Sequence, residues 1–135
     1  MTTTRRQILL GAAALGLLPV ARAAQAMIDY TPGLVQAWLA AGETVFVDFS
    51  ATWCSTCRAQ GRVIEALRAA NPAYDAAMTF VKVDWDTHGT GELSRALNIP
   101  RRSTLVLLRG EEELGRIVAQ TAEADIRALM DLGLG

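Results

Sequence analysis

Cys54 and Cys57 are the only cysteines in this 135-residue chain, and two residues separate them. A thiolate attacks disulfide bonds, and a second sulfur about one helical turn away can close a small disulfide ring with the first. A disulfide that closes so short a loop adds little stability, which argues against a purely structural pair. A zinc site normally needs four ligands, whereas this chain has one histidine, His88, and no second cysteine pair. The pair therefore favours thiol–disulfide chemistry over a zinc site.

The residues on either side of the pair predict a strand followed by a helix. Residues 45–49 form an almost continuous apolar run, which is typical of a strand buried on both faces. After the pair, apolar residues recur at helical spacing: Val63, Ile64, Leu67 and Ala70. Cys54 then stands at a helix start, where free backbone N–H groups stabilise a thiolate. We expect Cys54 to be the exposed and more acidic thiol.

One carboxylate, Asp48, interrupts the apolar run six residues before Cys54. Burial of an unpaired carboxylate raises its pKa, so Asp48 can exchange a proton with Cys57 near neutral pH. The alternative is a carboxylate turned to solvent at the end of the strand. The apolar neighbours of Asp48 leave little solvent nearby and favour the buried interpretation.

Residues 47–58, VDFSATWCSTCR, resemble the active-site region of the thioredoxin superfamily. The shared features are the buried Asp48, the tryptophan Trp53 directly before the first cysteine, and the Cys-x-x-Cys motif itself. The likeness continues through residues 81–84 and 99–108, and it covers nearly all of the chain after about residue 30. It implies an α/β thioredoxin fold with a central mixed sheet of about four to five strands flanked by helices.

The resemblance also implies a role for each site residue. Cys54 attacks a substrate disulfide, Cys57 resolves the mixed disulfide, and Asp48 carries the proton. Lys82 matches a family lysine beside the buried aspartate, although a lysine whose stem packs while its head reaches water fits equally well. The residues expected at the active-site turn and substrate-facing loop are Trp53, Ser55, Thr56, Arg102, Ser103 and Thr104.

Trp53 and His88 each have a non-catalytic interpretation. Trp53 is expected to cover the redox turn and shield Cys57, and a purely structural aromatic is the alternative. His88 lies in a Gly-rich segment, where a solvated loop histidine is the favoured interpretation.

The loop before residue 104 departs from the family pattern. Relatives carry a cis-proline directly before the threonine that opens this strand, whereas this chain has Ser103; Pro100 is the other candidate. A cis bond before serine costs roughly 3 kcal/mol, so we expect a trans bond and more open sulfurs. The Ser103 hydroxyl could donate to the Cys54 thiolate, and Arg101 and Arg102 could lower its pKa further. A pair of solvated arginines is the alternative.

The rest of the chain predicts alternating helices and strands, which favour parallel strand neighbours. Residues 27–30 are too few for more than a stub of a strand. The expected elements are a helix capped by Thr31, a strand at 79–84, a short helix at 92–97, a strand at 104–108 with a hairpin partner at 113–119, and a last helix capped by Thr121.

Residues 1–26 are predicted to be a twin-arginine-type signal peptide, and residues 27–135 a single thioredoxin-like domain. Arg5 and Arg6 precede an apolar run, and residues 21–23 and 24–26 both fit a small-x-small cleavage site. We therefore expect export to the periplasm. The alternative is an uncleaved N-terminal membrane anchor, although the run of about a dozen apolar residues is shorter than the roughly 20 that span a bilayer.

Charge narrows the expected partners. Residues 27–135 keep 10 of the 13 basic residues and all 14 acidic residues, a formal charge of −4, which argues against nucleic-acid binding. We expect a monomer without cofactor or metal that acts on protein disulfides and takes electrons from a membrane thiol donor. The sequence resembles thioredoxin and the C-terminal domain of DsbD more than strongly oxidising relatives, which favours a reductase. A disulfide oxidase or isomerase, and a metal-binding assembly module that holds a soft ion through both thiolates, remain open.

Overall fold

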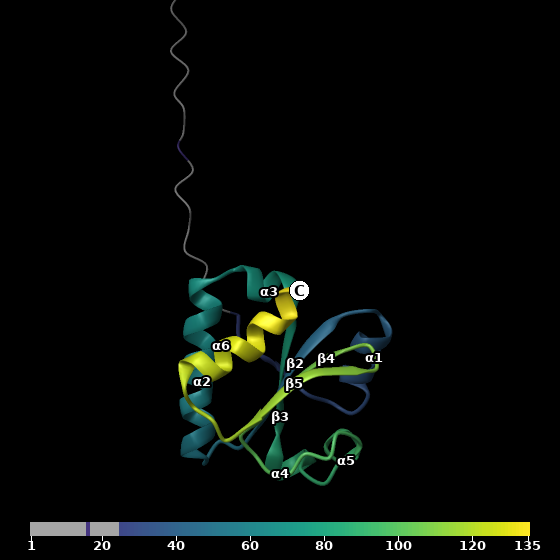
Figure 1. Ribbon diagram of the computed structural model, residues 1–135. Coiled ribbons are helices and arrows are strands. Elements are labelled where there is room, and N and C mark those ends of the chain that lie inside the picture. The colour runs from purple at the N-terminus through teal and green to yellow at the C-terminus, as the bar shows by residue number, and fades with distance from the viewer. Residues whose placement is uncertain (1–15, 17–24) are drawn as a thin grey trace, which may run out of the picture.

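The computed structural model describes residue 16 and residues 25–135 (Figure 1). The expected signal peptide therefore lies outside the described residues, apart from Gly16, Gln25 and Ala26, and its cleavage and the anchor alternative stay predictions. Within the described part of the chain, no helix combines the length and apolar character needed to cross a membrane.

Five strands form one mixed sheet in the order β1-β3-β2-β4-β5. β3 pairs in parallel with β1 and with β2, whereas β4 pairs antiparallel with β2 and with β5. The strands are β1 (Ile28–Asp29), β2 (Thr44–Ser50), β3 (Thr79–Asp84), β4 (Thr104–Arg109) and β5 (Glu112–Val118). This sheet confirms the expected α/β class and the mixed sheet of four to five strands, with β1 as a two-residue stub.

Helices cover both faces of the sheet, with α2 and α6 on one side and α1 on the other (Figure 1). The helices are α1 (Leu34–Ala40), α2 (Ser55–Ala70), α3 (Ala73–Ala77), α4 (Trp85–His88), α5 (Glu92–Ala96) and α6 (Glu123–Asp131), followed by the 3-10 turn η1 (Leu132–Leu134). α2 follows β2 after four residues, so the Cys-x-x-Cys motif lies at the C-terminal end of the central strand.

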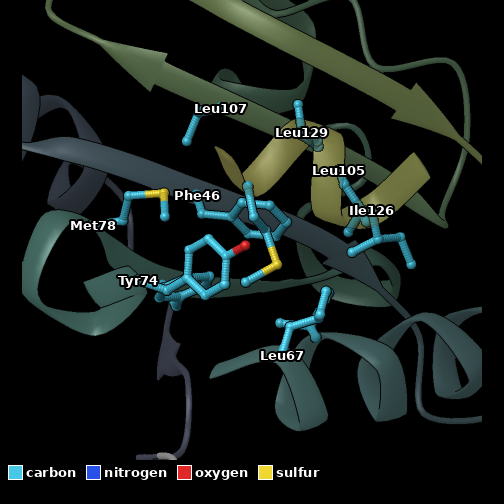
Figure 2. Close-up of a cluster of buried hydrophobic side chains, with 11 residues drawn as sticks. Phe46, Leu67, Tyr74, Met78, Leu105, Leu107, Ile126 and Leu129 are labelled. Atoms are coloured by element: carbon cyan, nitrogen blue, oxygen red, sulfur yellow. The ribbon is translucent and has the colours of Figure 1, made fainter. Parts of the chain in front are cut away.

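Two apolar cores lie on the two faces of the sheet. The first, shown in Figure 2, packs Phe46 of β2 against residues of β4, α2, α3 and α6, including Leu105, Leu67, Tyr74 and Ile126. The second packs the alternate residues of the strands against α1 and α5; among them are Val35, Val45, Val47, Phe49, Val106 and Leu93. Because successive strand residues face opposite sides, Asp48 shares the face of Phe46 and points toward the α2 side.

Two helix caps differ from the prediction. α1 begins at Leu34 with Gly33 as its N-cap in the left-handed region at φ 88°, and Thr31 instead accepts the Leu34 N–H in a turn at 3.1 Å through its carbonyl. α6 has Ala122, not Thr121, as its N-cap, and no side chain caps it. In both helices a backbone carbonyl accepts the first helical hydrogen bonds. The threonine hydroxyl lies outside capping range, because Thr31 is two residues before its N-cap and Thr121 one residue before.

The expectation of a solvated loop for His88 is also wrong. His88 is the last residue of α4 and is half-buried. Its ring meets the buried ring of Tyr30 edge-on, with 5.0 Å between the ring centroids. Aromatic packing against Tyr30 explains why this histidine is partly withdrawn from solvent.

Candidate functional site

Cys54 is the N-cap residue of α2, and its Sγ accepts a hydrogen bond from the Cys57 N–H at 3.2 Å. Both cysteines are free thiols, and they are 3% and 2% exposed. The expectation of an exposed Cys54 is therefore wrong, as is that of more open sulfurs. The half-buried Trp85 packs against the cluster of Ala51 and both cysteines, and Ser103, from the loop before β4, contacts both sulfurs.

Ser103 is the loop residue that contacts the sulfurs. Its Oγ lies 3.3 Å from Cys54 Sγ and 3.1 Å from Cys57 Sγ, and the residue is fully buried. Pro100, the other candidate for this slot, is exposed. No cis peptide bond occurs in the described ranges, so the bond from Arg102 to Ser103 is trans. A hydroxyl that can donate to either sulfur thus occupies the position beside the dithiol.

The backbone of Ser103 is in the left-handed region at φ 64°, which costs a non-glycine residue about 1–2 kcal/mol. Three hydrogen bonds hold it there. Its N–H donates to Phe49 O at 2.8 Å, and its carbonyl accepts from the Ala119 N–H at 2.8 Å and from Gln60 Nε2 at 3.0 Å. A strained conformation persists where several neighbours enforce it, and strand β2, the end of β5 and helix α2 all do so here.

Trp53 faces solvent, with 56% of its surface exposed, and its expected shielding of Cys57 stays a prediction. Its indole N–H donates to both carboxylate oxygens of Asp86, at 3.1 and 3.0 Å. The Arg102 guanidinium lies over its ring, with 4.5 Å from Cζ to the ring centroid. Anchored on one side by an acid and on the other by a cation, Trp53 forms an outer wall of the site.

The thiol of Cys54 is acidified by its neighbours. Burial alone would raise its pKa, but hydrogen bonds from Cys57, from the Ser103 hydroxyl, from the Cys57 N–H and from Arg102 outweigh burial and lower the pKa from 9.0 to about 6. Cys54 is therefore largely a thiolate at neutral pH, which agrees with the acidity expected from its place at a helix start.

Asp48 is 1% exposed, and neither carboxylate oxygen has a hydrogen-bond partner within the described structure. Burial raises its pKa from 3.8 to about 7; the positive charge of Lys82 opposes this rise and the charge of Cys54 adds to it. Asp48 and Lys82 are partners across the parallel β2–β3 register. The structure therefore favours the buried interpretation over a carboxylate in solvent.

A cleft of about 560 Å³ opens between the ends of β1 and β3 and the first turns of α2. Cys57 lines it from α2 and Lys82 from β3, and the remaining charged residues of its wall are Asp29, Arg58, Arg62, Glu65 and Asp84. Lys82 is exposed and lines this cleft, which agrees with a lysine whose head reaches water. The cleft gives solvent an approach to the Cys57 side of the motif.

The remaining predicted residues take supporting positions. Ser55 is exposed and Thr56 half-buried in the first turn of α2. Thr104 opens β4, and its hydroxyl donates to Arg101 O at 2.7 Å, which closes the loop below Ser103. Arg101 is exposed, as a solvated arginine would be, whereas Arg102 is half-buried against Trp53.

Three site residues were missed by sequence reasoning: Gln60, Trp85 and Asp86. Gln60 could have been found, because it falls on the buried stripe of α2 with Cys57, Ile64 and Leu67 and is its only amide. Asp86 offered no signal, since its contact with Trp53 joins residues 33 positions apart. As for a metal, no group of three or more His, Cys, Asp or Glu side chains lies together among residues 25–135.

Comparison with known proteins agrees with this geometry. The family model described as thioredoxin matches residues 31–132. Thioredoxin of Mycobacterium tuberculosis is 34% identical over 95 residues, which cover 70% of this chain and 78% of that protein. Thioredoxin H2-1 of rice is 40% identical over 74 residues, or 55% of this chain, and the match spans about half (49%) of the rice protein.

Solved structures give the same result. The crystal structure of Trxlp from Edwardsiella tarda has a TM-score of 0.65 at 29% identity, covering 78% of this chain and 96% of that one. Thioredoxin of Malassezia sympodialis, at 23% identity and a TM-score of 0.65, covers 89% and 99% and supports the fold alone. With a family model matched over more than half of its length, this chain belongs to the thioredoxin family of thiol–disulfide oxidoreductases.

Proposed function

We propose that this protein reduces disulfide bonds of other proteins in the periplasm through the Cys54–Cys57 dithiol. The observation that carries the proposal is the set of donors around Cys54 Sγ: the Cys57 N–H at 3.2 Å and the Ser103 hydroxyl at 3.3 Å. Both groups stabilise a sulfur that carries negative charge, which is the form that attacks a disulfide.

In the first step, the Cys54 thiolate attacks one sulfur of a substrate disulfide. A bond forms between Cys54 Sγ and that sulfur, the substrate S–S bond breaks, and the second substrate sulfur leaves as a thiolate. Because Cys54 is 3% exposed, the groups that cover its sulfur, Trp85 and the loop that carries Ser103, have to yield to the incoming chain.

In the second step, Cys57 resolves the mixed disulfide. The Asp48 carboxylate accepts the Cys57 proton, and the Cys57 thiolate attacks Cys54 Sγ, releases the first substrate sulfur and closes the Cys54–Cys57 disulfide. Two electrons have then passed from the dithiol to the substrate. A carboxyl group with a pKa of about 7 suits this proton transfer near neutral pH, and the nearby Lys82 charge keeps that pKa from rising further.

The oxidised protein needs a donor of two electrons to act again. We propose that residues 1–26 are a twin-arginine-type signal that exports the protein, and that a membrane thiol protein reduces it there. Arg5→Lys combined with Arg6→Lys should leave the precursor in the cytoplasm. A mature N-terminus at Met1 with membrane sedimentation would instead support the anchor alternative.

One observation favours a second function, disulfide oxidation or isomerisation. The donors around Cys54 also stabilise the reduced dithiol, which raises the reduction potential and makes a protein a better oxidant. Equilibrating the Cys54/Cys57 couple in a glutathione and dithiothreitol series tests the direction. A potential near about −270 mV supports the reductase, whereas one between about −180 and −120 mV overturns it in favour of the isomerase or oxidase.

A further inference from the structure

Gln60 is a fully buried amide one turn after Cys57 in α2. Its Nε2 donates to two backbone carbonyls, those of Ser103 and Gln120, both at 3.0 Å. Its Oε1 is buried and has no partner in the described structure. A buried acceptor without a partner is destabilising, and an apolar residue on this stripe of the helix would avoid it. The amide thus loses free energy at Oε1 and gains it at Nε2, where it pairs two backbone carbonyls.

The two carbonyls that Gln60 bridges come from the ends of two different segments. Ser103 ends the loop before β4, and Gln120 follows the last strand, β5. Ala119, directly before Gln120, donates its N–H to Ser103 O and has a left-handed backbone at φ 60°. Gln60 thus ties a strained pair of segments to the helix that carries both cysteines.

The orientation of the Ser103 hydroxyl depends on this attachment. With φ at 64°, the side chain of Ser103 points at the two sulfurs, and an ordinary negative φ would turn it elsewhere. Two of the hydrogen bonds of the Ser103 backbone are made with other backbone groups: its N–H donates to the Phe49 carbonyl, and its carbonyl accepts from the Ala119 N–H. Within residues 25–135, Gln60 supplies the one side-chain hydrogen bond to the Ser103 backbone.

We propose that Gln60 is a positioning residue for thiol–disulfide exchange, which holds Ser103 so that its hydroxyl reaches both Cys54 and Cys57. When Cys54 is a thiolate, the hydroxyl donates to it. The same hydroxyl lies 3.1 Å from Cys57 Sγ in the reduced protein, so it can donate to Cys57 once Cys54 is bound to substrate. A glutamine on α2 and a serine on the loop together keep a hydrogen-bond donor fixed beside the two sulfurs. The effect of Gln60 on the rate of disulfide exchange rests on the proposed function. Its effect on the position of Ser103 does not, because that concerns the reduced protein alone.

The test is the titration of Cys54, followed in the reduced protein by thiolate absorbance at 240 nm. Gln60→Met keeps the volume and removes the amide; we expect the Cys54 pKa to rise by about one unit, as it should for Ser103→Ala. In the double variant the two shifts should not add, because Gln60 acts only through the hydroxyl that Ser103→Ala already removes. Gln36→Met, an exposed glutamine of α1, is the matched control and should leave the titration unchanged.

Each result decides the inference. The inference would be overturned if the Cys54 pKa were unchanged in Gln60→Met but shifted in Ser103→Ala. It would also be overturned if the two pKa shifts were fully additive in the double variant, because additivity indicates a general structural effect. If Gln60→Met does not fold, the wild-type protein still gives an answer by NMR: the side-chain N–H resonances of Gln60 should titrate with Cys54, and flat resonances refute the link. None of these readouts needs a substrate, so loss of the reductase assignment would leave them intact.

Discussion

Residues 44–70 and residues 98–103 meet at the two sulfurs, but different interactions hold them in place. The first region is a buried central strand that leads directly into a long helix, so its backbone is hydrogen-bonded along nearly its whole length. The second is a loop without regular structure, with positive φ at Asn98 and at Ser103. Its contact with the sulfurs depends on three remote partners: Phe49, Ala119 and Gln60.

This difference separates two kinds of sensitivity. Cys54 and Cys57 are placed by a strand and a helix that pack into the apolar cores of the domain through many side chains. One substitution elsewhere therefore rarely moves them. The hydroxyl of Ser103 is placed by a few hydrogen bonds, so the loss of one partner changes the environment of both sulfurs. The position of the nucleophile is thus robust, as are the contacts from Cys57 that lower its pKa, whereas the contribution of the Ser103 hydroxyl to that pKa is sensitive to the loop.

Exchange of each sulfur for oxygen gives the largest expected effect. Either Cys54→Ser or Cys57→Ser should abolish disulfide reduction, but only Cys57→Ser should accumulate mixed disulfides with substrates, because Cys54 carries the stabilised thiolate. Non-reducing gels and mass spectrometry of the trapped species measure this. The two cysteines are equally buried, so equal trapping by both variants would show that the donors around Cys54 do not select the nucleophile.

Ser103→Pro should have the next largest effect, on stability. Proline requires φ near −65°, whereas residue 103 has φ 64°, and it would remove the N–H that donates to the buried Phe49 carbonyl. We expect a loss of about 3 kcal/mol in the free energy of unfolding, measured by urea denaturation. Pro100→Ala, in the same loop but exposed, should change it by less than about 0.5 kcal/mol. The reverse pattern would mean that Pro100 holds this loop.

The features that could be predicted from the sequence lie mostly in the first region, residues 44–70, and those that could not lie in the second, residues 98–103. The apolar run of β2, the helical spacing of α2 and the motif between them are local patterns, and they predicted the burial of Asp48 and the acidity of Cys54. The mixed sheet followed from the resemblance that these residues bear to the thioredoxin superfamily. The burial of Cys54 could not be read locally, because Trp85 and the 98–103 loop, which cover it, come from distant parts of the chain.

The loop itself shows why prediction stopped there. The sequence identified both Ser103 and Pro100 as candidates for the slot beside the sulfurs, and spacing alone could not separate them. What separates them is a left-handed backbone enforced by partners 16 to 54 residues away, among them Phe49 and Ala119. Likewise, the contacts of Trp53 with Asp86 and Arg102 join it to residues 33 and 49 positions away, so its outward orientation could not be read from the local sequence.

Asp48→Asn should raise stability, in contrast to Ser103→Pro. At pH 8 the buried carboxylate is ionised without partners, which costs about 4 kcal/mol given a pKa near 7 against 3.8 unfolded. A buried amide without partners costs about 1–3 kcal/mol, so the net gain should be roughly 1–3 kcal/mol. Asp29→Asn, the same change at an exposed position of β1, should be neutral. Resolution of the mixed disulfide by Cys57 should slow near neutral pH only in Asp48→Asn.

Stability should also depend on pH in two opposite ways. The raised pKa of Asp48 favours the protonated folded protein, so stability is full below pH 3.8 and falls as pH rises to about 7. The lowered pKa of Cys54 favours the folded thiolate, so its contribution is full above pH 9 and is lost as pH falls through about 6. Reduced wild type should therefore be least stable near pH 6–7. Asp48→Asn should lose the decline between pH 4 and 7 and keep the later rise; a decline that survives in the variant would assign it to another group.

Arg102→Met should produce the smallest effect and tests the outer wall alone. The guanidinium is the last of the groups that lower the Cys54 pKa, and it is half-buried, so solvent screens part of its charge. Its removal should raise the Cys54 pKa by a few tenths of a unit, less than loss of the Ser103 hydroxyl. The same change at the exposed Arg101 is the control and should leave the titration unchanged. A shift as large as that of Ser103→Ala would mean that the cation, and not the hydroxyl held by the loop, dominates the acidity of Cys54.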